Sequence, residues 1–128
     1  MSVVTYYDER VTLNMKDKTM TAPTIAEIVT FRLKDGCDPA EFIKAAEAMT
    51  PFLRGTGAMV SRTLSAGDDG VWTEFITWSS KDAALAAAEA MFARPEAGPF
   101  MEMIEPTDMS MQHAAISLYL PPEDHAPH

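Results

Sequence analysis

Apolar and polar residues alternate along four stretches of the chain, the pattern of half-buried strands. The clearest is Thr24–Leu33, TIAEIVTFRL. One face of this stretch carries Val29, Phe31 and Leu33. The other carries Ala26, Ile28, Thr30 and Arg32. The other three predicted strands are Ala58–Ser65, Val71–Trp78 and Met109–Leu120.

A helix is predicted after the first strand. Asp38 is suited to cap it, and proline follows at the first helical position, with glutamate three residues after the cap. Apolar residues then recur at helical spacing, and Pro51 should kink or end the helix near Thr50. The apolar stripe consists of Phe42, Ala46, Met49 and Leu53.

A second helix follows the third strand. Ser79 or Ser80 can cap it, and the alanine-rich sequence behind them is typical of a helix. Its apolar face is predicted to be Leu85, Ala88 and Phe92. A short helical turn is expected over Phe100–Ile104, before the last strand.

The element order is therefore βαββαβ, an α+β, ferredoxin-like arrangement. It predicts a four-stranded antiparallel sheet with two helices on one face. In the strand after the Gly67–Gly70 turn, Val71 and Phe75 point one way. Trp72, Ile76 and Trp78 point the other way, and we expect them on the face without helices. A homodimer would cover such an apolar patch.

The chain of 128 residues divides into three parts. Residues 1–23 are an N-terminal extension, either an extra edge strand or an arm embracing a partner subunit. Residues 24–120 form the domain, a usual length for one core. Residues 121–128 are expected to be a mobile tail.

Composition narrows the function classes. A net charge of −9 disfavours nucleic acid, because that field repels phosphates. No apolar run is long enough to span a membrane, and the N-terminus does not resemble a secretory signal. With a single cysteine, Cys37, the chain suits the cytoplasm. The ten methionines are either adaptable core residues or a plastic ligand-binding wall.

Three features resemble the dimeric α/β-barrel superfamily, and within it the antibiotic-biosynthesis-monooxygenase-like (ABM) group. They are the strand IAEIVTFRLKDG, the strand and helix start FITWSSKDAALAA, and the closing short helix and strand. The resemblance implies two subunits packed sheet against sheet, with small ligands bound between sheet and helices or in the barrel mouth. Some members of the group oxygenate phenols without metal or flavin, and others oxidise quinols.

Heme-degrading relatives use an asparagine, a tryptophan and a histidine. The resemblance places Trp78 at the tryptophan, but Ile28 stands where the asparagine would be. Arg94–Ile104, where the histidine would lie, contains none. Heme degradation is therefore disfavoured.

His113 and Glu74 are the candidate catalytic bases. His113 could instead be an ordinary strand histidine, and Glu74 could pair with Arg62 or Arg32 across the sheet. The scattered histidines predict no metal site. The candidate substrate-binding residues are Trp72, Ile76, Trp78, Ile28, Thr30 and Arg32.

These observations lead to the hypothesis of a cofactor-independent monooxygenase acting on a small aromatic, polyketide or quinol-type molecule. The alternative is a non-catalytic dimer that binds a small apolar or aromatic ligand or has a structural role. A heme-handling protein is the third alternative.

Overall fold

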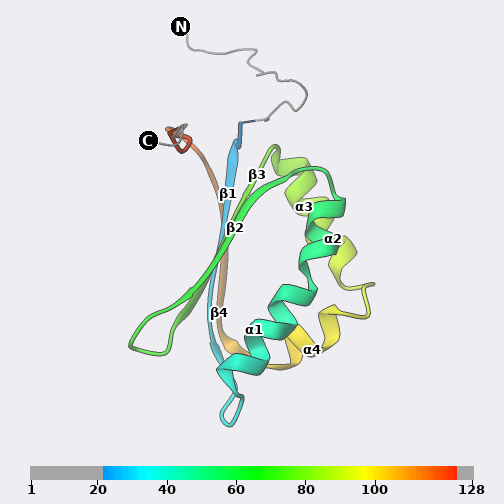
Figure 1. Cartoon of the computed structure of the whole chain (residues 1–128), viewed down its shortest axis with the longest axis vertical. Helices are drawn as coiled ribbons and strands as arrows, with labels where there is room; N and C mark the ends of the chain where they lie inside the picture. Colours follow the sequence, from blue (N-terminus) through cyan, green and yellow to red (C-terminus); the bar gives the residue numbers. More distant parts are fainter. Residues whose placement is uncertain (1–21, 124–128) are drawn as a thin grey trace, which may run out of the picture.

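The computed structural model describes residues 22–123, in which one antiparallel sheet carries all the helices on a single face (Figure 1). The four strands lie in the order β2-β3-β1-β4. The elements are β1 (Ile25–Leu33), α1 (Pro39–Ala48), α2 (Thr50–Gly55), β2 (Met59–Ala66), β3 (Trp72–Trp78), α3 (Lys81–Met91), α4 (Ala97–Glu102) and β4 (Ile104–Ala115).

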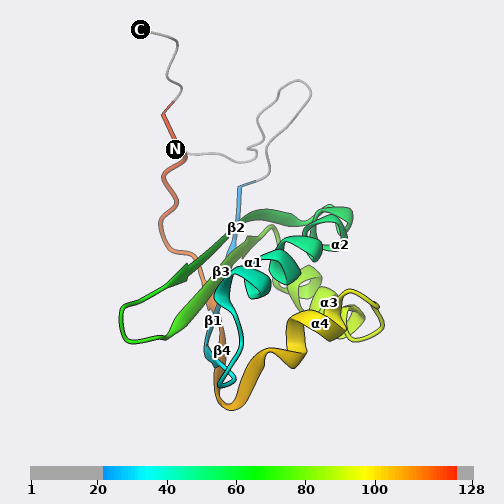
Figure 2. The same ribbon diagram turned by 60° about the horizontal axis from the view of Figure 1, so that its bottom comes forward.

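This arrangement confirms the predicted α+β, ferredoxin-like fold. All three strand pairings are antiparallel. Each of the two predicted helices is followed by a second, shorter one, so α1 continues into α2 and α3 leads to α4 (Figure 2). The predictions for the N-terminal extension and the tail concern residues 1–21 and 124–128, which lie outside the described part of the chain.

The first helix begins and breaks where the sequence predicted. The Asp38 side chain accepts a hydrogen bond from the Ala40 backbone N–H at 3.0 Å. The helix breaks at Met49, because Pro51 has no N–H to continue the backbone ladder. The predicted stripe is buried throughout: Phe42, Ala46, Met49 and Leu53 are all less than 7% exposed.

Replacing Asp38 by alanine should lower the free energy of unfolding by about 1 kcal/mol, because one backbone N–H of the first turn loses its partner. Urea unfolding measures the change. Asp35→Ala is the matched control in the exposed turn and should change stability by less than about 0.5 kcal/mol. Equal effects of the two variants would contradict a capping role.

Two predicted details were wrong. In α3 the buried residues are Ala84 and Ala87, whereas Leu85 is 47% exposed and Phe92 is 74% exposed. Alanines allow this helix to approach the sheet closely, and Leu85 is turned away from it. The last strand spans Ile104–Ala115 instead of Met109–Leu120. It includes Pro106, which an edge strand tolerates because one side of its backbone is unpaired.

The faces of the sheet are also the reverse of the expectation. Trp72, Ile76 and Trp78 point at the helices and are at most 9% exposed, whereas Phe75 lies on the open face and is 39% exposed. Alternation shows which residues share a face, but not which face the helices cover. The core forms between this face and the helices, around the ring of Phe42. That ring lies 5.6, 5.1 and 5.3 Å, centroid to centroid, from Phe31, Trp72 and Phe100.

The open face of the sheet is uncharged over its central part. Three cross-strand rows of four residues make up this area. They are Ser61, Thr77, Ala26 and Ala114; Thr63, Phe75, Ile28 and Gln112; and Ser65, Thr73, Thr30 and Ser110. With charged residues making up 23% of the chain, twelve neighbouring positions without a charge are unusual. The apolar patch of two tryptophans that led to the homodimer hypothesis does not exist.

Candidate functional site

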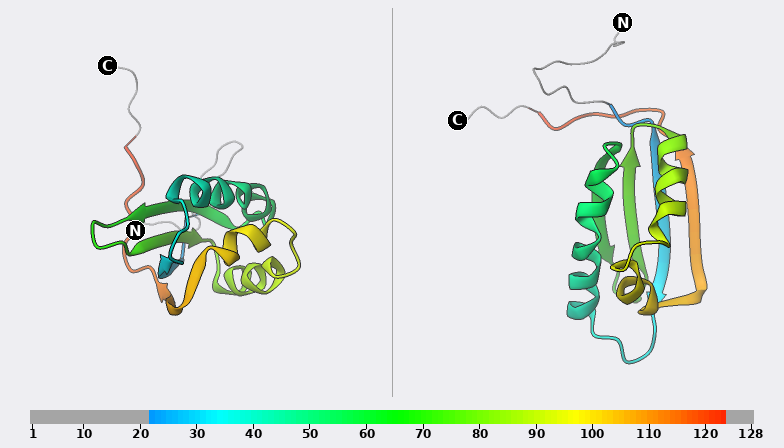
Figure 3. Two further views of the ribbon diagram at one scale, coloured as in Figure 1. Left: turned by 90° about the horizontal axis from the view of Figure 1, so that it is seen from below. Right: turned by 90° about the vertical axis from the view of Figure 1, so that its right-hand side faces the viewer.

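One cross-strand row on the helix-covered face places charged side chains inside the domain. It runs from β2 to β4 through Arg62, Ile76, Glu27 and His113. Ile76 is 4% exposed and separates the charged residues into two clusters. Both clusters lie between the sheet and the helices, which run side by side in front of the sheet in the right-hand view of Figure 3.

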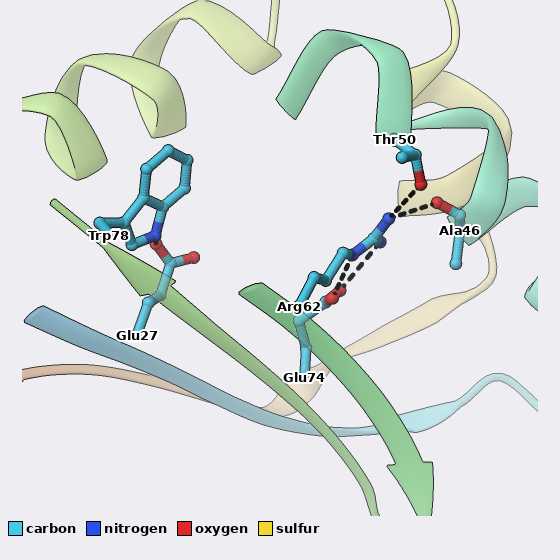
Figure 4. A network of polar contacts seen from close by, with 6 residues as sticks. All are labelled: Glu27, Ala46, Thr50, Arg62, Glu74 and Trp78. Carbon is cyan, nitrogen blue, oxygen red and sulfur yellow. Dashed lines mark hydrogen bonds and ion pairs between the residues drawn. The ribbon is translucent and has the colours of Figure 1, made fainter. Parts of the chain in front are cut away.

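The first cluster is centred on Glu27, which is 7% exposed. The indole Nε1–H of Trp78 donates to Glu27 Oε1 at 3.0 Å (Figure 4). His113 Nε2 lies 3.3 Å from the same oxygen. Burial raises the pKa of Glu27 above its ordinary 4.5, and the contacts with His113 and Trp78 only partly oppose this effect. A carboxylate with a raised pKa is better suited to accept a proton near neutral pH.

The second cluster is an ion pair between β2 and β3. Arg62 donates from Nε to Glu74 Oε2 at 2.5 Å and from Nη2 to Glu74 Oε1 at 3.2 Å. Its Nη1 donates to the carbonyl of Ala46 at 2.7 Å and to Thr50 Oγ1 at 3.3 Å. Figure 4 shows the guanidinium between the strands and the α1–α2 break. Arg62 therefore fastens this break to the sheet.

Both clusters border one cavity between sheet and helices. Its volume is about 70 Å³. Apart from Glu27, Arg62 and Glu74, its walls are apolar, and five of the lining residues are methionines. These are Met49, Met91, Met101, Met109 and Met111. Because methionine side chains are flexible, this wall can change shape around a ligand. The placement fits the plastic-wall interpretation of the methionines, and Met49 also belongs to the core.

Arg62 also borders a second space. An open groove of about 420 Å³ lies beside α1 and β2, lined by Ile43, Leu64 and Trp72 among others. The Arg62 side chain lines both the groove and the cavity. Its ion pair with Glu74 therefore stands at the boundary between them.

The structure brings together only part of the predicted site. Glu74, Ile76 and Trp78 line the cavity. His113 lies next to it through Glu27. Glu74 is the partner of Arg62, one of the two interpretations that the sequence left open.

The remaining candidates lie elsewhere. Trp72 packs in the core and lines the groove. Ile28 and Thr30 lie on the open face of the sheet. Arg32 donates to the carbonyl of Asp69 at 2.7 Å and so supports the β2–β3 turn. These four residues do not line the cavity.

Sequence reasoning missed Glu27. It stands in the first strand, on the face that also carries Val29 and Phe31. An acid in the middle of an apolar strand face is the signal that could have identified it, because buried carboxylates need partners. The partners come from distant parts of the chain, 51 residues away for Trp78 and 86 for His113.

Known proteins resemble this chain in structure, whereas the comparisons of sequence found no match. No family model matches the chain, and no curated protein matches it. Among solved structures, the cofactor-independent oxygenase SnoaB from Streptomyces nogalater matches with a TM-score of 0.61. The match is 19% identical and covers 79% of this chain and 100% of SnoaB.

A protein from Bordetella bronchiseptica, provisionally assigned as an antibiotic biosynthesis monooxygenase, has a TM-score of 0.64 at 16% identity. Here 76% of this chain and 100% of the other are covered. The chain therefore shares its fold with SnoaB and with this Bordetella protein. A conserved protein from Methanosarcina mazei shares the fold at 7% identity and a TM-score of 0.60, over 74% of this chain and 94% of its own. Similarity at this level shows that the fold is shared, and the chemistry must be inferred from the residues of the site.

Within residues 22–123, no helix is long and apolar enough to cross a membrane. The same part of the chain contains no group of three or more histidine, cysteine, aspartate or glutamate side chains placed to hold a metal ion.

Replacing Trp78 by phenylalanine should lower the free energy of unfolding by about 1–2 kcal/mol, because a ring remains and only part of its volume becomes a void. Ligand affinity should fall as well, because Trp78 lines the cavity. The loss of the indole N–H should also raise the pKa of Glu27 further, since that bond lowers it. Urea unfolding and ligand titration measure the first two effects. Unchanged ligand affinity would contradict a place for Trp78 in the binding wall.

Proposed function

We propose that this protein is a cofactor-independent monooxygenase acting on a small aromatic, polyketide or quinol-type molecule. The observation that carries the proposal is the Glu27 carboxylate, buried beside an apolar cavity and held there by Trp78 and His113. The fold shared with SnoaB supports it. Glu27 takes the role of proton acceptor, and His113 positions it.

The proposed reaction needs only a general base and an apolar cavity that excludes water. Glu27 removes a proton from a phenol or enol, and the resulting carbanion-like ring carbon donates electrons to O₂, forming a C–O bond. Protonation of the outer oxygen gives a hydroperoxide. Loss of the remaining C–H proton then breaks the O–O bond, leaving a carbonyl on the ring and releasing water. Each O₂ places one oxygen atom in the product and one in water.

The cavity constrains the substrate. An engineered apolar cavity of about 150 Å³ binds benzene. The space here, about 70 Å³, must roughly double to admit one aromatic ring. The flexible methionines that line it are the side chains best able to move. Small one-ring or two-ring substrates are therefore favoured over larger ones.

The test is oxygen uptake over a panel of hydroquinones, naphthols and anthrones, without added metal or flavin. We expect uptake to depend on the protein and to rise with pH through the raised pKa of Glu27, because only the ionised carboxylate can accept the proton. No uptake with any member of the panel would overturn the proposal.

The alternative of a non-catalytic ligand-binding protein is favoured by the small, almost wholly apolar cavity. A ligand that binds stoichiometrically without oxygen uptake would support it. The heme alternative gains no support from the structure, because His113 Nε2 already contacts Glu27. Hemin titration tests it, and a Soret shift at one equivalent would revive it.

Homodimerisation also remains a proposal, now through the open face defined above. Its twelve central residues are uncharged, and Ile28 and Phe75 lie at its centre. Two such faces could pack without burying charge, which is the costly part of an interface. Light scattering at micromolar concentration should give twice the 14.0 kDa of the chain. A monomer mass would contradict the proposal. Phe75→Glu should dissociate the dimer, whereas Leu85→Glu on the opposite side should not.

A further inference from the structure

Nearly all polar hydrogen-bond donors of the cavity wall are already used. The indole N–H of Trp78 donates to Glu27. Four of the five N–H groups of Arg62 donate to Glu74, the Ala46 carbonyl and Thr50. The fifth shares nitrogen Nη2 with a bond to Glu74, so an anion reaching it would lie against the Glu74 carboxylate.

The cavity wall still has a hydrogen-bond acceptor without a partner among the described residues. Both contacts to Glu27 go to Oε1, and Oε2 has no hydrogen-bond partner within residues 22–123. Glu27 also lines the cavity. In addition, two carboxyl groups border the cavity against one guanidinium, and that guanidinium is already paired. The wall can therefore receive a hydrogen-bond donor, but it offers nothing to balance a negative charge.

We propose that the cavity selects neutral aromatic ligands that donate a hydroxyl hydrogen and rejects analogues that also carry a carboxylate. The inference rests on the proposed function and specifies its substrate class. A carboxylate brought into the cavity would lose its water and gain no partner, which is strongly unfavourable. It would also face the carboxyl groups of Glu27 and Glu74 at short range. The neutral hydroxyl instead finds Oε2 of Glu27.

The wild-type protein provides the first test, by calorimetric titration at pH 7.5 with three related probes. These are 2-naphthol, 6-hydroxy-2-naphthoic acid and the methyl ester of that acid. The ester is the control for size, because it has the bulk of the acid without its charge. We expect naphthol and ester to bind within a few-fold of each other, and the acid to bind at least tenfold more weakly than the ester.

The second test removes the carboxylate that occupies Arg62. Glu74→Gln removes the negative charge opposite Arg62 and one of its two acceptor oxygens, so that one guanidinium donor becomes free and the affinity for the acid, relative to the ester, rises at least tenfold. Glu89→Gln, at an exposed position of α3, is the control and should leave the ratio unchanged. Thermal unfolding shows whether the Glu74→Gln variant folds. If the variant does not fold, the comparison of acid and ester binding by the wild type still tests the inference.

Three outcomes would overturn the inference: equal binding of acid and ester by the wild type, no binding of any probe, or a folded Glu74→Gln that gains nothing for the acid. Binding does not require turnover, so its failure is distinguishable from failure of the proposed function. Selective binding without oxygen uptake would remove the monooxygenase proposal alone. Oxygen uptake with unselective binding would remove this inference alone.

Discussion

Replacing Glu27 by glutamine should lower the rate of oxygen uptake about 10²–10⁴-fold, the usual contribution of a positioned general base. The substitution keeps the shape of the side chain and an oxygen that can still accept from Trp78. It removes the ability to accept a proton from the substrate. Binding of a neutral ligand should change much less than the rate, because the cavity walls stay in place.

The pH dependence of oxygen uptake is a second test of Glu27 as the proton acceptor. Burial raises the pKa of Glu27, so uptake by the wild type should begin to rise only above the ordinary carboxyl pKa of 4.5. The residual activity of Glu27→Gln should lack this rise. The rise in the Trp78→Phe variant should move to higher pH, since a bond that lowers the pKa of Glu27 is lost. His113→Gln removes the other contact that lowers this pKa and should move it in the same direction.

Glu89→Gln serves as the matched control, being an exposed glutamate on α3. It should keep the full rate and the same pH profile. If Glu27→Gln kept more than a third of the wild-type rate, Glu27 would not be the proton acceptor. Glu74 would then be the remaining buried carboxyl group at the cavity.

Replacing Arg62 by methionine should lower the free energy of unfolding by about 3–5 kcal/mol, the cost of leaving one partner of a buried ion pair alone. Glu74 is 5% exposed and would lose both hydrogen bonds from the guanidinium. The Ala46 carbonyl at the end of α1 would also lose a donor. Guanidinium chloride unfolding measures the change.

The double variant Arg62→Met, Glu74→Leu distinguishes the cost of an unpaired buried charge from the cost of altered side-chain packing. With both charges gone, most of the lost stability should return, because apolar residues of similar size often replace a buried pair without cost. Arg54→Met is the control on the exposed surface of α2, with an expected change within about 0.5 kcal/mol. A loss below 1 kcal/mol for Arg62→Met alone would show that water reaches Glu74 when the arginine is absent.

The site could be predicted only in part, and the strand faces show why. Alternation in β3 correctly grouped Trp72, Ile76 and Trp78 on one face. Their apolar character suits either a core or a subunit interface, and the expectation that they lie on the face without helices is wrong. The same error affects the predicted binding site, because Ile28 and Thr30 lie on the opposite side of the sheet from these three residues.

The features that the sequence by itself determined are those that depend on interactions between residues close together in the chain. Asp38, Pro39 and Pro51 specify where the first helix begins and breaks, through bonds and steric effects within a few residues. The Gly67–Gly70 turn joins β2 and β3 as a hairpin, with Gly70 at a positive φ of 82°. Together with the alternating patterns, these signals were sufficient for the order of elements and the fold class.

Only the tertiary structure decided which face the helices cover and which charged groups meet beneath them. Glu27, Trp78 and His113 come from three different strands. The register places His113 directly opposite Glu27, and the indole of Trp78 reaches Glu27 from a diagonal position on β3. Arg62 meets Glu74 within a hairpin, but its contacts with Ala46 and Thr50 depend on how the helices pack on the sheet. Burial, which raises the pKa of Glu27, is a property of that packing and of no single stretch of sequence.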